Sequence, residues 1–544
     1  MKSKDSLILE EITSEDTQNI INSLKASCET EISKYLQKEF KDIYENIPSD
    51  KKEENGNIIY DIEFALDGEM FQMLKGINGS GDLDDEFFLF KKENDINKIW
   101  IRILEKSIKC LRFFDKREPF FKNPKKHPVA YGVDELSRYF SKYTNFEKML
   151  YGGAKYYRDH VIHVFRVWML GMSTLLKNNA QFLTEINIAN DTNFKFNSLE
   201  KISIWSIIAL THDLGYPLEK SQEIIYNTRD MMSCFINNPQ LSMDLSFNGI
   251  QNNMNDFVLR FASSKMIQKK YPCLESEETK VHYVARLQPK YYFKFQKSLE
   301  KYKHGTISAI IIYKMLLFFL ESDFNINEDY TFDIEDARQF YIRREILRAI
   351  ASHTCKDIYH LKMETFSFLL IIIDDCQDWG RKNISELYVK NKNTYNFEYI
   401  KASFENKNVY SCQIKDSIDF DKDSRDDIER VLNNLFKQFR DYSSWFRDGQ
   451  DTINRNFSVS KESILRINES SPVTFTVKFN VANTEISTFT ITVENPSSRY
   501  NENFLASIFT NELPSKNIKG KLVIQSNYKS DLDSDISLYK FKLD

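Results

Sequence analysis

The sequence predicts a mainly α protein that ends in a small β-rich domain, and three observations support this prediction. Only 15 glycines and 11 prolines occur among 544 residues, so few residues are present that interrupt helices. Between about residues 135 and 400, apolar residues recur at helical spacings of three and four. Beyond residue 460 the apolar period changes to two, as in VTFTVKF and TFTITV, which is typical of strands.

Length and charge narrow the class of protein. A chain of 544 residues is too long for one ordinary core, so several domains are expected. The net charge of -5 gives no global reason to bind nucleic acid or an anionic membrane. The seven cysteines form no CxxC pair, which favours a reducing compartment. The most apolar stretch, residues 307–320, is too short to span a bilayer of about 30 Å. We therefore expect a cytoplasmic protein without a membrane partner.

Four segments are expected along the chain. Residues 1–135 form a helical N-terminal region that ends in a proline-containing basic stretch. Residues 136–400 form a helical domain, residues 401–460 a helical linker, and residues 461–544 the β-rich C-terminal domain. The main helices expected in the second segment span residues 156–176, 202–214, 304–320, 333–352 and 364–379.

The adjacent pair His212 and Asp213 is the strongest chemical feature. It ends the apolar helix ISIWSIIALTHDLG, in which Ile204 and Ile208 precede His212 at steps of four. The imidazole therefore follows the buried side of the helix. A carboxylate at the inner end of an apolar helix is costly unless it is paired or bound to a metal. The alternative is a helix end whose polar groups form only caps and salt bridges.

Four further residues repeat this pattern. His163 shares an apolar helix side with His160, His304 opens an apolar helix, and His353 extends another apolar stripe. Each histidine alone has another interpretation: His163 as a satisfied core residue, His304 as a cap of its helix, and His353 as a core residue bonded to a backbone carbonyl. Asp374 follows the buried run FSFLLIII, and burial of its charge demands a metal or a cation. Asp375 points about 100° away, and we expect it to be structural.

Taken together, the order His163, His212-Asp213, His304, His353 and Asp374 resembles the HD superfamily of metal-dependent phosphohydrolases. The resemblance covers about residues 150–385 and includes the phrase DDCQDWGR, which is similar to the closing phrase of some bacterial members. It implies an all-helical HD-domain bundle with the site in its core. It also implies one or two divalent ions (Mn, Fe, Mg or Zn), bridged by Asp213. The metal ligands that it implies are His163, His212, Asp213, His304, His353 and Asp374.

The resemblance also implies roles. Asp213 would bind the metals and position water, and His160 would be a proton donor. The basic residues near helix ends that are candidates for binding substrate phosphate are Lys220, Lys303, Arg343, Arg344 and Arg381. Many family members carry Lys shortly after the doublet, whereas Tyr216 stands there in this chain. The expected substrate is a nucleotide-like small molecule. The alternatives are an HD-type diiron oxygenase and a non-catalytic HD scaffold or sensor.

One segment raises a different partner. PKYYFKFQKSLEKYKHG, residues 289–305, interleaves lysines with aromatic residues, a combination that can bind single-stranded nucleic acid. We favour the simpler interpretation, an amphipathic helix with a lysine face. The N-terminal region and the β-rich domain remain candidates for homo-oligomer formation, substrate selection or partner binding.

Overall fold

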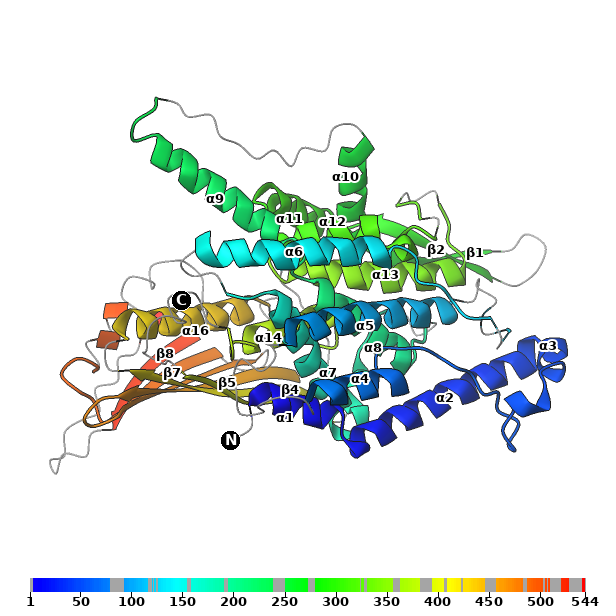
Figure 1. Cartoon of the computed structure of the whole chain (residues 1–544), viewed down its shortest axis with the longest axis horizontal. Coiled ribbons are helices and arrows are strands. Elements are labelled where there is room, and N and C mark those ends of the chain that lie inside the picture. Colours follow the sequence, from blue (N-terminus) through cyan, green and yellow to red (C-terminus); the bar gives the residue numbers. More distant parts are fainter. Residues whose placement is uncertain are drawn as a thin grey trace. The chain divides into compact units, whose positions relative to one another are not determined.

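The chain divides into two compact units. Residues 1–357 and 364–374 form the first unit, and residues 358–363 and 375–544 form the second. The computed structural model (Figure 1) describes residues 3–543 except for 79–91, 116–119, 121, 124–125, 154–157, 190–193, 238–249, 273–278, 323, 327–329, 356–362, 382–393, 406–408, 422–423, 446–455, 483–486, 502–503, 506, 509–519 and 528–540.

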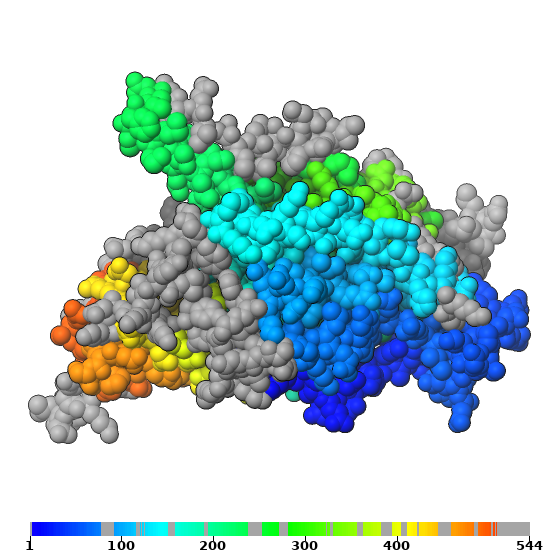
Figure 2. Space-filling view, viewed as in Figure 1, coloured from blue at the N-terminus to red at the C-terminus, as the bar shows by residue number. Residues whose placement is uncertain are grey.

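The first unit is predominantly helical. Its helices are α1 (Lys4–Ile12), α2 (Glu15–Glu39), α3 (Lys41–Glu45), α4 (Gly68–Asn78), α5 (Glu93–Phe113), α6 (Val133–Gly153), α7 (Val161–Glu185), α8 (Ser198–Thr211), α9 (Tyr216–Met232), α10 (Ile250–Ser263), α11 (Pro289–Glu300), α12 (His304–Met315), α13 (Ile334–Ser352) and all but the end of α14 (Phe366–Cys376). Among the described residues, no helix is both long and apolar enough to cross a membrane. Side chains of α5 and α6 cover much of the face of this unit seen in Figure 2.

Helix α8 lies in the core of the first unit. It is apolar on all sides, and every one of its residues from Leu199 to Thr211 is buried, as expected of a helix surrounded by others. Trp100 of α5 donates a hydrogen bond of 2.8 Å to the carbonyl of Leu210. Tyr139 of α6 donates one of 2.7 Å to the carbonyl of Leu214. These two bonds attach the last turn of α8 to α5 and the turn that follows α8 to α6.

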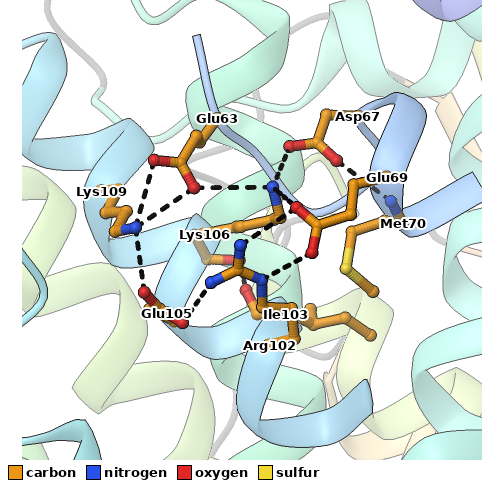
Figure 3. A network of polar contacts seen from close by, with 10 residues as sticks. Glu63, Asp67, Glu69, Met70, Arg102, Ile103, Glu105, Lys106 and Lys109 are labelled. Carbon is orange, nitrogen blue, oxygen red and sulfur yellow. Dashed lines mark hydrogen bonds and ion pairs between the residues drawn. The ribbon is translucent and has the colours of Figure 1, made fainter. Parts of the chain in front are cut away.

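An ion-pair network joins α5 to the segment that leads into α4 (Figure 3). Lys106, only 3% exposed, lies 2.5 Å from Asp67, 2.8 Å from Glu69 and 3.5 Å from Glu63. The neighbouring basic residues, Arg102 and Lys109, pair with the same acids and with Glu105. A buried ammonium is costly unless several acceptors surround it, so the network fixes how α5 lies beside α4.

The second unit is built on one seven-stranded sheet. Its strands lie in chain order: β3 (Thr394–Glu405), β4 (Val409–Asp421), β5 (Asn456–Asn468), β6 (Val473–Ala482), β7 (Ser487–Glu494), β8 (Gly520–Asn527) and β9 (Phe541–Leu543). The β4–β5 and β7–β8 pairs are parallel and the others antiparallel. A parallel pair needs a crossover connection, and α16 (Arg425–Trp445) lies in the connection from β4 to β5. Its Phe439 packs against Phe479 and Phe489 of the sheet.

The prediction of a mainly α fold with a small C-terminal β domain is wrong: the protein is a mixed α/β structure. The sheet begins at Thr394, inside the segment predicted to be a helical domain, and β4 lies in the segment predicted to be a helical linker. A two-stranded sheet, β1 (Ser264–Pro272) and β2 (Thr279–Leu287), is also inserted between helices of the first unit. The reason is composition. Polar residues fill the exposed face of these strands and hide the period-two burial of residues such as Ile414 and Ile418.

A substitution at Gly171 of α7 can test how closely α7 packs on α8. A Cβ atom at this position would lie 1.9 Å from Cζ2 of Trp205, and the buried indole has no space to move into. We expect Gly171→Ala to lower the free energy of unfolding by about 1–3 kcal/mol, the usual cost of overpacking. The measurement is urea unfolding followed by circular dichroism.

The matched control is Gly76→Ala in α4. A Cβ there would meet no atom within 4 Å, so the better helix propensity of alanine should stabilise the protein by up to about 1 kcal/mol. Equal effects of the two substitutions would contradict the tight α7–α8 contact.

Candidate metal centre

Asp213 lies at the centre of a cluster of four histidines. Its Oδ1 atom is 3.2 Å from Nε2 of His304 and 3.5 Å from Nε2 of both His212 and His353. Its Oδ2 atom is 3.7 Å from Nε2 of His163. The side chain of Asp213 is only 5% exposed. The structure therefore brings five of the predicted ligands to one point.

Asp374 completes the cluster from α14. Its Oδ1 atom is 2.8 Å from Nε2 of His163 and 3.8 Å from Nε2 of His212. With 27% of its side chain exposed, it is the most open of the six residues. Two overlapping groups of three have ligand atoms close enough to hold a metal ion: His163, His212 and Asp374, and His212, Asp213 and His353. Imidazole and carboxylate together are the donors that Zn, Fe and Mn accept.

The six side chains come from the ends of helices. His212 and His353 are the C-cap residues of α8 and α13. His304 is the first residue of α12, and His163 lies in the first turn of α7. Helix ends carry the backbone groups that have no partner inside the helix. Polar side chains are therefore tolerated there even where the helices themselves are apolar.

The Nδ1 atoms of His212 and His353 are held by backbone carbonyls outside the cluster. Nδ1 of His212 lies 2.8 Å from the carbonyl of Ala209, and Nδ1 of His353 lies 2.6 Å from the carbonyl of Ile350. A carbonyl only accepts, so each Nδ1 carries the hydrogen. The Nε2 atoms of these two rings face Asp213, are buried, and have no hydrogen-bond partner. This arrangement is typical of metal-binding histidines and fits a metal ion.

Two glycines let α12 approach its neighbours. A Cβ on Gly305 would lie 2.7 Å from the carbonyl oxygen of Ile350 and 2.9 Å from the ring of His353. A Cβ on Gly215 would lie 2.5 Å from the carbonyl oxygen of His304. The absence of a side chain at Gly305 therefore allows α12 to pack closely against the end of α13. It is what places His304 beside His353.

The electrostatics of the cluster follow from burial and mutual contact. Burial would raise the pKa of Asp213 and of Asp374, but contacts with the imidazoles hold both pKa values well below the ordinary value. Burial would lower the pKa of His304, but its bonds to Asp213 and Glu219 raise that pKa to about 9. Burial lowers the pKa of His353. Two anionic carboxylates thus lie where a cation is favoured.

Sequence reasoning missed Glu219. Its Oε2 atom lies 2.6 Å from Nδ1 of His304 and accepts the backbone N–H of His304 at 2.9 Å. Its Oε1 atom accepts from Lys303 at 2.6 Å. A signal was present, because Pro217 marks the start of a new helix, whose first turn follows the His212-Asp213 doublet directly. An acid in that turn points back toward the doublet.

His160 and Tyr216 form a wall beside the cluster. Their rings stack with centroids 3.5 Å apart, and the ring of Tyr216 also lies 5.2 Å from that of His304. The His160 ring is 6.0 Å from the ring of His163. Glu147 accepts the backbone N–H of His160 at 2.6 Å. His160 is therefore near the cluster but outside its ligand groups. Tyr216, which stands where the resemblance leads one to expect a lysine, covers the cluster with its ring instead.

The predicted phosphate-binding residues separate into two groups. Lys303 adjoins His304 and pairs with Glu219, and Lys220 pairs with Glu223 in the first turns of α9. The structure brings both to the vicinity of the cluster.

Arg343 and Arg344 are not brought to it. Arg343 is buried and donates to the carbonyl of Phe318 and to Gln339, and Arg344 donates to the carbonyl of Ile188. Arg343 precedes His353 by ten residues of α13, about 15 Å along a helix. Arg381 belongs to the second unit.

Most of the lysine-rich segment forms α11, and its aromatic residues differ in their exposure to solvent. Tyr292 and Phe295 are buried, whereas Phe293 is 64% exposed. A stacking surface for nucleic acid needs several exposed rings in sequence. The geometry of α11 therefore agrees with an amphipathic helix that has a lysine face.

The raised pKa of His304 predicts a pH dependence of the metal-free protein. A histidine whose pKa rises from 6.5 in the unfolded chain to about 9 in the folded protein contributes stability that is complete below pH 6.5 and lost as the pH rises through 9. We expect the melting temperature of chelator-treated protein to fall by several degrees between pH 7 and pH 9.5. Glu219→Gln should flatten this slope because it removes the negative charge of the Glu219 carboxylate, which faces Nδ1 of His304.

The control for this measurement is Glu223→Gln. Glu223 lies one turn further along α9 and is 57% exposed, so its removal should leave the pH slope unchanged. A Glu219→Gln protein with the wild-type slope would refute the assigned ion pair.

Comparisons with protein-family models, with curated proteins and with solved structures find no match for this chain. Similarity to a known protein therefore contributes nothing to the assignment of function. The evidence for a function is the cluster around Asp213 itself.

Proposed function

We propose that this chain is a divalent-metal-dependent phosphohydrolase of the HD type that cleaves a phosphate ester or anhydride of a nucleotide-like substrate. One observation supports the proposal above all others. The buried Nε2 atoms of His212 and His353, whose Nδ1 atoms are bonded to carbonyls, both face the carboxylate of Asp213. We place the protein in the cytoplasm, because no disulfide joins the cysteines among its described residues.

The ligands divide naturally into two positions that share Asp213. His163, His212 and Asp374 would hold one ion together with Asp213, and His304 and His353 would complete the second position. Support for the first position comes from the close grouping of His163, His212 and Asp374, and support for the second comes from the contacts of Asp213 with His304 and His353. An aspartate with imidazole nitrogens within 3.7 Å of both of its oxygens has the two donor atoms that a bridging ligand needs.

A divalent ion bound here would act as a Lewis acid on the phosphoryl oxygens and lower the pKa of a water molecule toward neutrality. The protein supplies the surroundings for this chemistry. Glu219 holds the ring of His304 in one orientation through its Nδ1 hydrogen. His160 is the candidate to deliver a proton to the leaving oxygen, because it is buried beside the cluster and outside the ligand groups.

The more open edge of the cluster is where a substrate would enter. Asp374 and His304 are the ligands with the largest exposed fractions, 27% and 18%. Lys303, adjacent to His304, is 38% exposed, and Lys220 is 26% exposed. These two ammonium groups could attract the oxygens of a phosphate to this edge, which favours an anionic substrate over a neutral one.

Metal analysis and one isosteric substitution test the proposal. We expect purified protein to retain one or two equivalents of Mn, Fe, Mg or Zn, and to hydrolyse members of a panel of nucleotides and phosphate esters when the ion is supplied. Asp213→Asn should abolish hydrolysis, by about 1,000-fold or more, because it removes the shared ligand. Chelation should lower the melting temperature of the wild-type protein and leave that of Asp213→Asn nearly unchanged.

The control is Asp375→Asn. Asp375 accepts a hydrogen bond of 2.9 Å from Tyr442 in the second unit, which an asparagine oxygen can also accept, so activity should stay within about twofold. Full hydrolysis by Asp213→Asn would exclude the proposed mechanism.

Iron-dependent oxygen consumption without phosphate release would instead assign the same ligands to a diiron oxygenase, because imidazole and carboxylate also suit iron. Retained metal without any turnover would favour a scaffold or sensor.

A further inference from the structure

A buried ion-pair cluster lies behind the first ligand, His163. Arg166 of α7 bonds Asp5 of α1 through two nitrogens, with Nη2 2.8 Å from Oδ2 and Nε 3.0 Å from Oδ1. Its Nη1 atom is 3.7 Å from Oδ2 of Asp159. The side chains of Arg166, Asp5 and Asp159 are 1%, 1% and 2% exposed. Three charged groups are therefore removed from water at one place. Two of them, Asp5 and Arg166, are 161 residues apart in the sequence.

Asp159 connects this cluster to the ligand. Its Oδ1 atom accepts the backbone N–H of His163 at 3.1 Å. That N–H belongs to the first turn of α7, where no carbonyl of the helix can accept it. Asp159 thus fixes the first turn of α7, and with it the position from which the imidazole of His163 reaches Asp374.

The energetics of burial make Asp5 part of this arrangement. A buried guanidinium is costly unless it is matched by carboxylates in good geometry, and the two-nitrogen contact with Asp5 is the strong form of such a pair. With Asp5 present, two carboxylates face one guanidinium and the three groups carry a net charge of -1. Without the Asp5 charge, Arg166 would be drawn toward Asp159, which would then loosen its bond to the backbone of His163.

We propose that Asp5 is a positioning residue of the metal centre: through Arg166 and Asp159, helix α1 sets the affinity of the His163 position for its ion. This inference rests on the proposed function, because it concerns the affinity of that centre for metal. Its effect has two parts of the same sign. Loss of the Asp5 charge makes the surroundings of the ion less negative, and it also frees the turn that orients His163.

Helix α1 provides its own control. Glu11 lies on the same helix and also reaches α7, where it accepts from Ser173 at 2.8 Å and pairs with Lys177 at 3.2 Å. Its side chain is 40% exposed, and neither of these partners is Arg166. Glu11→Gln therefore removes one carboxylate charge from α1 and leaves the cluster of Asp5, Arg166 and Asp159 intact.

The test is a titration of the full-length metal-free protein with Mn²⁺, monitored by calorimetry, together with the visible absorption spectrum of bound Co²⁺. We expect Asp5→Asn to weaken Mn²⁺ binding by about 10- to 100-fold, the usual effect of changing a group that supports a metal ligand, and to alter the Co²⁺ spectrum. Asp5→Glu, which keeps the charge, should recover most of the affinity. Glu11→Gln should bind within about twofold of the wild type.

The outcomes separate this inference from the proposed function. If wild-type protein binds Mn²⁺ and Asp5→Asn, folded by circular dichroism, binds it equally well with the same Co²⁺ spectrum, the positioning role is refuted and the proposed function stands. Wild-type protein that binds neither ion would refute both. If Asp5→Asn does not fold, Asp159→Asn replaces it. That variant keeps an oxygen for the N–H of His163 but removes the charge, and an unchanged affinity would overturn the proposal.

Discussion

The burial of the Asp213 carboxylate is the constraint on which the structure of the helical unit depends. A carboxylate that is 5% exposed at the end of an apolar helix is stable only if cations or strong donors surround it. Four imidazoles from four helices supply that surrounding. Each imidazole comes from a helix terminus. The constraint therefore fixes where α7 and α12 begin and where α8 and α13 end, relative to one another.

Close packing makes this convergence possible. Helix α8 has no polar face, so it must be enclosed by other helices, and the end of α8 is held by hydrogen bonds from Trp100 and Tyr139 to backbone carbonyls. Gly215 and Gly305 leave room for the backbone of one segment to approach the backbone of another. The site is thus positioned by main-chain contacts as much as by its own side chains, and substitutions of small residues outside the ligand set would displace it.

The sequence predicted the cluster better than it predicted the fold. A histidine on an apolar helix is conspicuous, so six residues spread from His163 to Asp374 could be grouped from pattern alone. Asp5 could not be found in this way, because an acid in the first turn of a helix is ordinary. The only sequence signal for Glu219 is its place in the turn that follows the doublet, and the tertiary contact is what gives it a role. The sheet was underestimated because its strands carry polar residues on one face, as in KASFE and SCQIKDS.

A comparison of two buried aspartates shows why we propose a metal ion at only one of them. Asp416 in the sheet of the second unit is 1% exposed, and its Oδ2 atom faces the ammonium of Lys461 at 3.1 Å and the hydroxyl of Tyr395 at 2.8 Å. Its charge is balanced by a residue that is always cationic at neutral pH. Asp213 faces imidazoles that differ from one another: contacts with Asp213 and Glu219 raise the pKa of His304 to about 9, whereas burial lowers the pKa of His353, which donates its Nδ1 hydrogen to a carbonyl. In the metal-free protein the His304 ring can therefore balance one carboxylate charge, but a neutral ring such as that of His353 cannot, whereas it can share a metal with a carboxylate. Histidines in place of lysines around Asp213 are therefore what favours the proposed metal centre over a structural ion pair in this chain.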